Sequence, residues 1–326
     1  MNVPSTALVT GCAGFIGSHL TESLLADGVR VIGVDCFNDN YGRAEKLRNL
    51  DLARGWDDFE FVPLDLARGD LGSLVAESEV VFHLAAEPGV RASWGRRFER
   101  YLQNNLSATQ HLLEAATEHS GRRFVFASSS SVYGHAEAFP TREDSLCRPF
   151  SPYGVTKHAA EEMCMLYHGN FGLDVVALRL FSVYGPRQRP DMAFRRFCDA
   201  IVAERPIRVF GDGEQTRDFT FVGDVVAAFR AAAVAPDPAG RVYNIGGGQQ
   251  VSVNDALALL GEFADRELDV EYVDVQHGDV VRTAADTSRA RSELGFMPGT
   301  DLSDGLQQEF EWARAQGTPR EILRRP

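Results

Sequence analysis

A glycine-rich turn near the N-terminus constrains the fold more than any other feature of the sequence. Residues 6–10 read as a short buried strand, and the spacing G-x-x-G-x-x-G follows directly, from Gly11 to Gly17. A helical pattern comes next, and then a second apolar strand at 30–34 that ends in Asp35. Strand, glycine turn, helix, strand and acid within the length of one βαβ unit predict an α/β fold with a doubly wound (Rossmann) parallel sheet.

Each part of this unit suits a dinucleotide. The first glycine permits the tight turn, the second lets the backbone approach a pyrophosphate, and the third lets helix and strand pack closely. The pyrophosphate then lies at the helix N-terminus, where free N–H groups and the helix dipole favour anions. Asp35 would accept hydrogen bonds from the adenosine ribose and repel a 2′-phosphate, so we expect NAD rather than NADP. The expected cofactor contacts in this unit are Gly11, Gly14, Phe15, Ile16, Gly17 and Asp35.

A second motif, Y-x-x-x-K, lies in the middle of the chain at Tyr153 and Lys157. Four residues apart on a helix, the two side chains share one face. An ammonium group beside a phenol stabilises the phenolate and lowers the tyrosine pKa from about 10, which would make Tyr153 a general base for a substrate hydroxyl. The alternative is an exposed helix face, where this spacing is common. The serine run at 128–131 follows a buried strand, and one of its hydroxyls could bond the same substrate oxygen.

Composition limits the class of protein and its partners. The 326 residues, 44% of them hydrophobic and 24% charged, allow one large or two medium globular domains. The net charge of −13 argues against nucleic acid as a partner, because phosphate backbones need a basic face. The five cysteines lack C-x-x-C spacing, so neither a disulfide framework nor a metal site is expected. Without an apolar run of membrane-spanning length or a signal segment, we expect a cytoplasmic protein with no membrane partner.

The two motifs together resemble the short-chain dehydrogenase/reductase superfamily. The resemblance extends over nearly the whole chain and is to the extended branch, the NAD-dependent nucleotide-sugar epimerases and dehydratases. An asparagine near the active site of that family is matched by Asn105, although Ala108 stands where glycine is usual. The alternative for Asn105 is the surface of a helix over 98–119. Further cofactor contacts that the resemblance implies are Asp65, Leu66, Leu84, Ala85, Ala86, Asn105, Tyr153 and Lys157.

The alternation of strands and helices breaks after a strand at 175–180. We therefore expect an NAD-binding Rossmann domain at 1–180 and a smaller domain at 181–326 that mainly binds a nucleotide sugar. The two would be interleaved, because 242–246 again reads as a strand and turn that could return to the main sheet. The last residues, 319–326, read as a loosely held tail. Family resemblance also implies a homodimer through helices of the N-terminal domain.

The residues after the serine strand sort the chemistry within the family. The 4,6-dehydratases typically carry an Asp-Glu pair there, and UDP-glucuronate decarboxylases a Glu just before Val-Tyr-Gly. This chain has Ser130 and Ser131 instead. What remains is oxidation and reduction at one carbon, which predicts an isomerase, a 4-epimerase of a UDP-sugar. In that reaction Tyr153 and Lys157 would form the catalytic pair, and Ser129 or Ser130 would bond the C4 oxygen.

The substrate sugar is indicated by a segment that follows the strand at 175–180. Ser182 stands where hexose 4-epimerases usually have Asn, and residues 187–193, 37–39 and 89–91 resemble UDP-glucuronate 4-epimerases. A carboxylate at sugar C6 calls for a bidentate partner, for which Arg189 is the candidate. Its alternative is an ordinary loop arginine.

Two further arginines lie in segments that resemble the nucleotide-binding and distal diphosphate-binding segments of the family. These are Arg217 and, in the stretch that begins at Asp279, Arg282. They would hold the two phosphates through forked hydrogen bonds, or else lie on a solvated surface. The expected substrate contacts are Arg91, Ser131, Ser182, Arg189, Arg217 and Arg282.

The sequence thus predicts interconversion of UDP-glucuronate and UDP-galacturonate with a retained NAD, through a transient 4-keto intermediate. Three alternatives remain. One is a 4-epimerase of neutral UDP-hexoses such as UDP-glucose, and a second is a UDP-glucuronate decarboxylase. The third is a non-catalytic NAD-binding regulator that kept the fold, against which the intact Ser/Tyr/Lys set counts.

Overall fold

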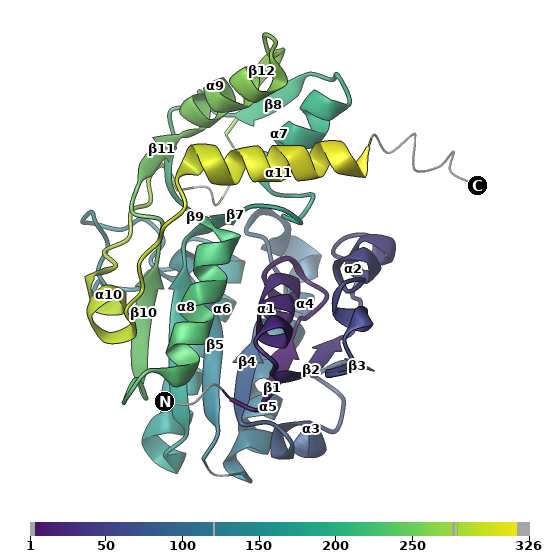
Figure 1. The fold of residues 1–326 in the computed structure, drawn as a ribbon. Coiled ribbons are helices and arrows are strands. Elements are labelled where there is room, and N and C mark those ends of the chain that lie inside the picture. Colours follow the sequence, from purple (N-terminus) through teal and green to yellow (C-terminus); the bar gives the residue numbers. More distant parts are fainter. Residues whose placement is uncertain (1–3, 120, 276–277, 279, 318–326) are drawn as a thin grey trace.

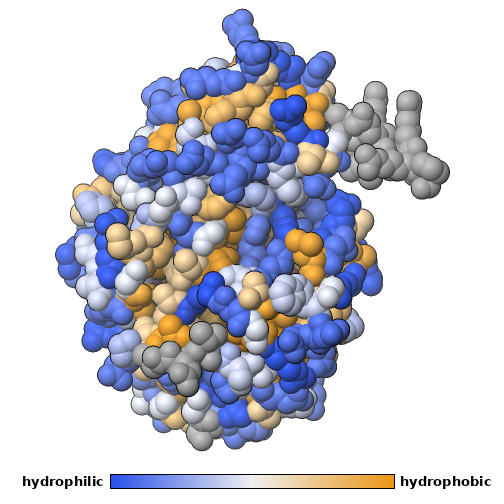
Figure 2. Space-filling view, viewed as in Figure 1, coloured by the Kyte–Doolittle hydropathy of each residue, from blue (hydrophilic) through white to orange (hydrophobic). Residues whose placement is uncertain are grey.

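A computed structural model describes residues 4–119, 121–275, 278 and 280–317. The predicted tail at 319–326 and Asp279 of the predicted diphosphate-binding segment lie outside the described residues. Within the described part, no helix is both long and apolar enough to cross a bilayer. The face drawn in Figure 2 carries mostly hydrophilic residues, with smaller hydrophobic groups between them.

A parallel sheet forms the centre of the molecule (Figure 1). Among the described residues it has seven strands in the order β10-β6-β5-β4-β1-β2-β3. The order reverses between β1 and β4, so the sheet is doubly wound, as predicted, and ligands of such sheets bind at the carboxyl ends of strands beside this reversal. In sheet order the strands are β10 (Arg241–Ile245), β6 (Asp174–Leu180), β5 (Arg123–Ser129), β4 (Val80–His83), β1 (Thr6–Thr10), β2 (Arg30–Asp35) and β3 (Phe59–Pro63).

Helices cover both faces of this sheet. One face packs against α1 (Phe15–Ala26) and α8 (Val222–Val234), with α10 (Ser288–Leu294) beside β10. The other packs against α3 (Gly72–Ala76), α5 (Ala108–Thr117) and α6 (Pro152–Phe171). Shorter helical elements in connections are α2 (Arg43–Asn49), η1 (Ala53–Gly55), η2 (Arg91–Ser93), η3 (Gly95–Arg97) and η5 (Ser130–Val132).

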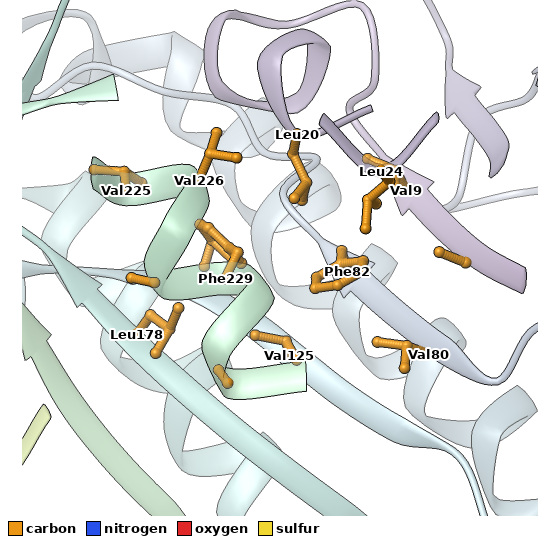
Figure 3. Packing of buried hydrophobic residues seen from close by; sticks show 14 of the residues in the cluster. Val9, Leu20, Leu24, Val80, Phe82, Val125, Leu178, Val225, Val226 and Phe229 are labelled. Carbon is orange, nitrogen blue, oxygen red and sulfur yellow. The ribbon is translucent and has the colours of Figure 1, made fainter. Parts of the chain in front are cut away.

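Figure 3 shows the core between the sheet and the first of these layers. Leu20 and Leu24 of α1 and Phe229 of α8 point toward strand residues such as Val9 and Phe82, and all five are buried. The rings of Phe82 and Phe229 meet edge to face, with centroids 6.3 Å apart. A fully buried side chain of this size stabilises the fold by about 1.5–3 kcal/mol. This packing fixes α1 against the strand ends where the glycine turn lies.

The helix predicted over 98–119 is divided in the structure. It begins as α4 (Phe98–Tyr101), widens into a π-helical stretch, η4 (Leu102–Ser107), and continues as α5. Asn105 lies in the π-helical stretch and is fully buried, so the alternative that placed it on a helix surface is excluded. Such π-helical turns are rare in proteins overall, but those that occur are often at functional sites.

A smaller unit lies at one end of the sheet (Figure 1). It contains a mixed sheet of β11 (Gln250–Ser252), β9 (Thr216–Phe221) and β7 (Ser182–Tyr184), and a parallel pair of β8 (Ile207–Phe210) and β12 (Val270–Val273). Its helices are α7 (Ala193–Val202), α9 (Val253–Ala264) and α11 (Leu302–Gln316). They enclose a separate aromatic and aliphatic core that includes Tyr184, Phe194 and Phe310.

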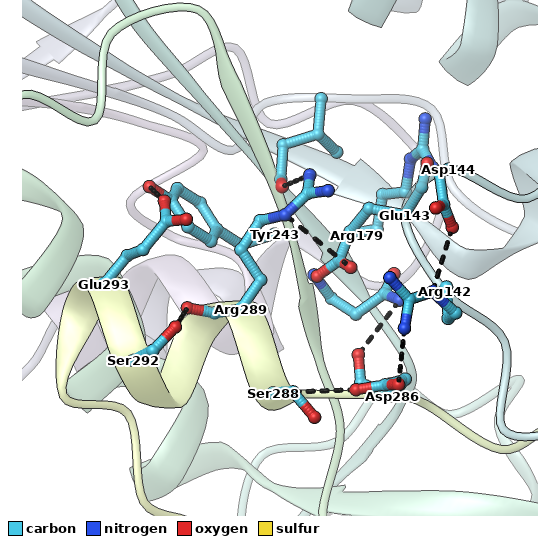
Figure 4. A network of polar contacts seen from close by, with 12 residues as sticks. Arg142, Glu143, Asp144, Arg179, Tyr243, Asp286, Ser288, Arg289, Ser292 and Glu293 are labelled. Atoms are coloured by element: carbon cyan, nitrogen blue, oxygen red, sulfur yellow. Dashed lines mark hydrogen bonds and ion pairs between the residues drawn. The ribbon is translucent and has the colours of Figure 1, made fainter.

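Strand β10 comes from the C-terminal half of the chain and pairs with β6, with Asn244 opposite Arg179. A polar network ties it to the segment before α6 (Figure 4). Glu143 accepts a hydrogen bond from the Asn244 N–H at 2.9 Å, and its carbonyl accepts one from Arg179 at 3.0 Å. Arg142 pairs with Asp286 at 3.9 Å. We propose a division near residue 180, with 241–245 belonging structurally to the first unit.

Candidate active site

The glycine-rich turn lines a cavity that follows the carboxyl ends of the sheet strands. Gly11 has a φ of +72° and donates its N–H to the Val34 carbonyl at 2.7 Å. A Cβ atom at Gly17 would lie 2.1 Å from the Gly11 carbonyl oxygen, so only glycine lets α1 approach the turn this closely. Helix α1 begins at Phe15 with Gly14 as its N-cap and no side-chain cap. The first N–H groups of α1 are therefore left for an anionic ligand.

An acid ends the second strand in the same cavity. Asp35 is buried, and its Oδ1 accepts a hydrogen bond from the Phe37 N–H at 2.8 Å and lies 3.4 Å from the Lys46 Nζ. An acid at one end and an uncapped helix N-terminus beside it match the ribose and pyrophosphate of a dinucleotide, so the residues fit NAD. The predicted cofactor contacts that line the cavity are Gly11, Gly14, Phe15, Ile16, Gly17, Asp35, Asp65, Leu66, Leu84, Ala85, Ala86, Tyr153 and Lys157.

The Tyr–Lys motif reaches this cavity from the first two turns of α6. The helix is capped by Ser151, whose Oγ accepts the Gly154 N–H at 3.1 Å, and a proline occupies its first position. Lys157 is buried, with its Nζ 4.2 Å from the ring centroid of Phe126. Burial lowers the pKa of Lys157 to about 8, because the charged form loses its hydration.

The pKa of Tyr153 differs from the expectation. Burial raises it above the usual value, and the two groups that lower it are the Ser129 hydroxyl and the Arg189 guanidinium. The prediction that Lys157 pulls this pKa down is therefore wrong for the structure as it stands, because desolvation of the phenol outweighs the favourable neighbours. Ser129, one of the two serines predicted to bond the substrate oxygen, interacts with the phenol, and its contact with substrate stays a prediction.

A second cavity of about 460 Å³ adjoins the first and shares Tyr153 and Arg189 with it. Its wall combines segments that are far apart in the chain: η2, the end of β5, the start of β7, and α7 with β8. Predicted residues on this wall are Arg91, Ser129, Ser130, Ser131, Ser182 and Arg189. The serines, the tyrosine and the arginine thus face one space.

Arg189 lies on the connection between β7 and α7, where the two cavities meet. Its Nε and Nη2 donate to the two carboxylate oxygens of Asp191 at 3.0 and 2.9 Å. The connection is fastened to α1, because Arg187 pairs with Glu22 at 2.8 Å and the His19 Nε2 lies 2.8 Å from the carbonyl oxygen of the preceding residue, Pro186. The Arg189 guanidinium is therefore oriented by Asp191, and the backbone just before Arg189 is held against α1.

Two cavity arginines were missed by the sequence analysis. Arg196 of α7 and Arg208 of β8 line the second cavity together with Phe210. The guanidinium carbons of Arg91 and Arg196 lie 4.2 and 5.0 Å from the Phe210 ring centroid. Burial lowers the pKa of Arg196, and the positive charges of Arg91 and Arg208 lower it further. Three arginines in one cavity favour an anionic ligand, although Arg208 also pairs with Glu271 at 3.3 Å. No motif marks Arg196 or Arg208, although each interrupts an apolar pattern.

Three predicted residues are not on the walls of these cavities. Asn105 lies behind the wall of the first, where its Nδ2 donates to the Thr156 Oγ1 of α6 at 2.9 Å. Arg217 donates to the carbonyl of Val281 at 3.2 Å. Arg282 donates to Gln250 at 2.6 Å and lies over the ring of Phe139. Their contacts with cofactor or substrate stay predictions.

Comparison with known proteins identifies the family. Residues 7–246 match the family described as "NAD dependent epimerase/dehydratase family". The chain belongs to this family, whose members use NAD and the extended form of the short-chain dehydrogenase fold. The predicted family, fold class and NAD cofactor are confirmed.

Individual relatives are similar over nearly their whole length. The solved structure of UDP-glucuronic acid 4-epimerase from Bacillus cereus, in complex with UDP-glucuronic acid and NAD, is 41% identical, with a TM-score of 0.93 over 95% of this chain and 99% of that one. The "Uncharacterized UDP-glucose epimerase YtcB" of Bacillus subtilis (strain 168) is 45% identical over 94% of this chain and 96% of its own. The UDP-glucose 4-epimerase of Mycolicibacterium smegmatis is 39% identical over 94% and 98%.

Proposed function

We propose that this protein interconverts UDP-glucuronate and UDP-galacturonate. The coarser assignment, an NAD-dependent UDP-sugar 4-epimerase and hence an isomerase, is confirmed by the family and its relatives. The observation that carries the finer one is the position of Arg189, which lies on both cavities together with Tyr153. A guanidinium at this position faces the sugar ring rather than the distal nucleotide.

The chain supplies acid–base chemistry at the sugar C4 oxygen. NAD, held in the first cavity by the glycine turn and Asp35, would supply the hydride acceptor for C4 and, once reduced, the hydride donor for the 4-keto sugar. In its phenolate form, which the Ser129 hydroxyl and the Arg189 guanidinium favour, Tyr153 accepts the C4 hydroxyl proton, and as the phenol it later gives this proton back. Ser129 or Ser130 holds the C4 oxygen, and Lys157 provides positive charge behind the phenol while it is protonated. Because the pKa of Lys157 is about 8, this charge is present at neutral pH.

Arg189 can bind a C6 carboxylate while it stays paired with Asp191. A guanidinium has five N–H donors, of which Asp191 takes one on Nε and one on Nη2. The remaining donors, on Nη1 and Nη2, are available to a second carboxylate. Asp191 then acts as the group that fixes the guanidinium plane. A neutral hydroxymethyl group would leave these donors without an ionic partner, so the site favours a uronic acid.

The nucleotide end of the substrate is proposed to lie against the arginine cluster. Arg91, Arg196 and Arg208 supply the positive charge that a diphosphate needs, with Phe210 between them. Arg217 and Arg282 stay candidates for the same role through side-chain rotation, as the sequence predicted.

We also propose the homodimer that the sequence predicts. Helix α6 leaves two large apolar side chains of one face exposed by about half or more, Val155 at 49% and Leu166 at 59%. Pairing of this face with its copy would remove them from water. Multi-angle light scattering tests the assignment, and a mass near 35.9 kDa contradicts it.

A 4-epimerase of neutral UDP-hexoses is the second candidate, because two of the relatives carry UDP-glucose in their names. Proton NMR of the purified protein with UDP-glucuronate and, separately, UDP-glucose distinguishes them without added cofactor. Conversion of the glucuronate to its C4 epimer supports the proposal. Exclusive conversion of UDP-glucose overturns it. A decarboxylated pentose product would show that the chain is a UDP-glucuronate decarboxylase. Inertness toward both sugars would favour the non-catalytic NAD-binding regulator.

A further inference from the structure

The loop that follows the ribose acid, residues 36–42, is bonded to the opposite wall of the cofactor cavity through one buried carboxylate. Glu87 lies just after β4, with only 6% of its side chain exposed. Its Oε2 accepts hydrogen bonds from the Asn38 amide at 3.3 Å and, in the amide orientation that satisfies both of its atoms, from Asn40 at 3.0 Å. One acid thus holds two side chains of the loop.

The opposite wall contributes donors to the same carboxylate. Asn104 donates to the Glu87 Oε2 at 3.4 Å, and Arg100 donates to it at 3.5 Å. Arg100 also donates to Asp39, a loop residue whose side chain is 82% exposed. The contacts therefore run from a buried carboxylate out to the surface. We call the contacts among Asn38, Asp39, Asn40, Glu87, Arg100 and Asn104 the Glu87 bridge.

The bridge lies at the cofactor cavity. Asn38, Asn40 and Tyr41 line the cavity on the loop side, and Pro88 and Asn104 line it on the other. The cavity between them is the one that contains the glycine turn and Asp35. A ligand in this cavity is thus flanked by the two halves of the bridge.

Glu87 is the fixed end of the bridge. Its backbone N–H donates to the Asn105 Oδ1 at 2.6 Å, and its carbonyl accepts the Asn105 Nδ2 at 3.1 Å. Asn105 is itself bonded to Thr156, one turn after Tyr153 on α6. The π-helical stretch therefore anchors Glu87 to the catalytic helix, whereas the loop at 36–42 is bonded to Asp35 and Lys46 on its own side of the cavity.

We propose that the Glu87 bridge retains NAD, so that the loop must detach from Glu87 before the cofactor can leave. An epimerase returns its hydride to the sugar in every turnover, so its cofactor needs no exchange, and slow release costs no activity. The inference depends on NAD binding and is independent of which sugar is the substrate.

The test is the rate at which NADH leaves the protein. Reduced cofactor is loaded, an excess of NAD is added, and the fall of NADH fluorescence is followed, with cofactor content after purification as a second readout. Glu87→Ala should release NADH about 10–100 times faster than the unaltered protein, because it removes several charge-assisted hydrogen bonds at once. Asn40→Ala and Asp39→Ala should accelerate release less than Glu87→Ala. Asn40→Ala should have the larger effect of the two, because Asn40 contacts both Glu87 and Asn38, whereas Asp39 contacts Arg100.

The matched control is Asp174→Ala, which breaks a partly buried ion pair with Arg123 at 2.9 Å on the opposite ends of the strands. It should release NADH at the unaltered rate. Unchanged release from Glu87→Ala, or equal acceleration by Asp174→Ala, would overturn the proposal. Should Glu87→Ala fail to fold, the exposed Asp39 and the loop residue Asn40 carry the test, and unchanged release from both substitutions refutes it.

Discussion

The two cavities that meet at Tyr153 are built in different ways. The cofactor cavity is formed at the ends of neighbouring strands of one parallel sheet, and its glycine turn lies within a few residues of sequence. The substrate cavity combines a loop after β4, a serine segment, a connection to α7 and a strand of the smaller unit. Backbone geometry defines the first cavity, and long side chains from distant segments define the second.

The charges of the two cavities differ as well. Two acids, Asp35 and Asp65, line the first cavity, whereas three arginines, Arg91, Arg196 and Arg208, line the second. Acids suit ribose hydroxyls, and arginines suit phosphates or carboxylates. A chain with a net charge of −13 therefore concentrates positive charge where its anionic substrate is proposed to bind. If the first cavity binds the cofactor and the second binds the substrate, substitutions in each should affect different measurements.

Tyr153 belongs to both cavities, and its removal should have the largest effect. Tyr153→Phe removes the proton acceptor and should lower turnover by about 10³-fold. Cofactor content should stay unchanged, because the ring remains in place. Turnover is measured by NMR of the epimerisation, and cofactor content is measured on the same sample. Wild-type turnover would exclude Tyr153 from the chemistry, and loss of NAD would mean that its hydroxyl serves the cofactor cavity.

Gly17→Ala changes the backbone geometry of the first cavity, where the glycine turn lies. The new methyl group would lie 2.1 Å from the Gly11 carbonyl oxygen, so α1 must move, at a cost of about 3 kcal/mol or more. We expect loss of NAD and a lower free energy of unfolding in urea. Gly55→Ala in η1, where a Cβ meets nothing within 4 Å, is the control and should be neutral or stabilising. A normal NAD content in Gly17→Ala would contradict the role given to this close approach.

Arg189→Ala tests whether the second cavity recognises the C6 carboxylate of the sugar. The KM for UDP-glucuronate should rise about 10–100-fold through loss of the carboxylate partner. The pKa of Tyr153 should also rise, since Arg189 lowers it, so the pH profile should move upward. Arg208→Ala is the matched arginine control and should weaken UDP-glucuronate and UDP-glucose alike. Equal effects of Arg189→Ala on both sugars would remove it as the carboxylate partner.

The smallest effect concerns stability in the smaller unit. Glu309 of α11 is fully buried and accepts the Gly185 N–H at 2.7 Å, and burial raises its pKa to about 8. Between about pH 4.5 and 8 the folded protein holds a proton that the unfolded chain has lost, so its stability falls as the pH rises. Glu309→Gln should flatten this fall in urea unfolding between pH 5 and 8. An unchanged slope would assign the pH dependence to another group.

The parts predicted from sequence are those with a local physical signal. Gly11 and Gly17 were recognised by the spacing of a glycine-rich turn, and Asp35 by its place at the end of a strand. Tyr153 and Lys157 were recognised by their four-residue spacing on a helix. Arg196 and Arg208 were missed because a charged residue on an amphipathic helix or an alternating strand reads as a solvent-facing position. Their position in one cavity depends on how α7 packs against β8, which no local pattern contains.

Electrostatic and helical detail was also beyond the sequence. The direction of the Tyr153 pKa depends on how much water the folded chain removes from the phenol, and spacing gives no measure of that. The burial of Asn105 could not be decided, because the π-helical stretch changes which face of the helix turns inward. The returning strand, by contrast, was predicted correctly, since its apolar residues and following glycines form a compact local pattern.

The position of β10 has a consequence for how the protein is made. Its partner β6 ends at Leu180, but β10 begins only at Arg241, so the sixty residues 181–240 are synthesised between the two neighbours. During that interval β6 presents an unpaired edge to the cell, which is the type of surface that attracts other extended chains. The cofactor unit can therefore complete its sheet only after the first part of the smaller unit, from β7 to β9, has been synthesised. A gene cut at residue 180 should yield an aggregating fragment, and the two units should mature together.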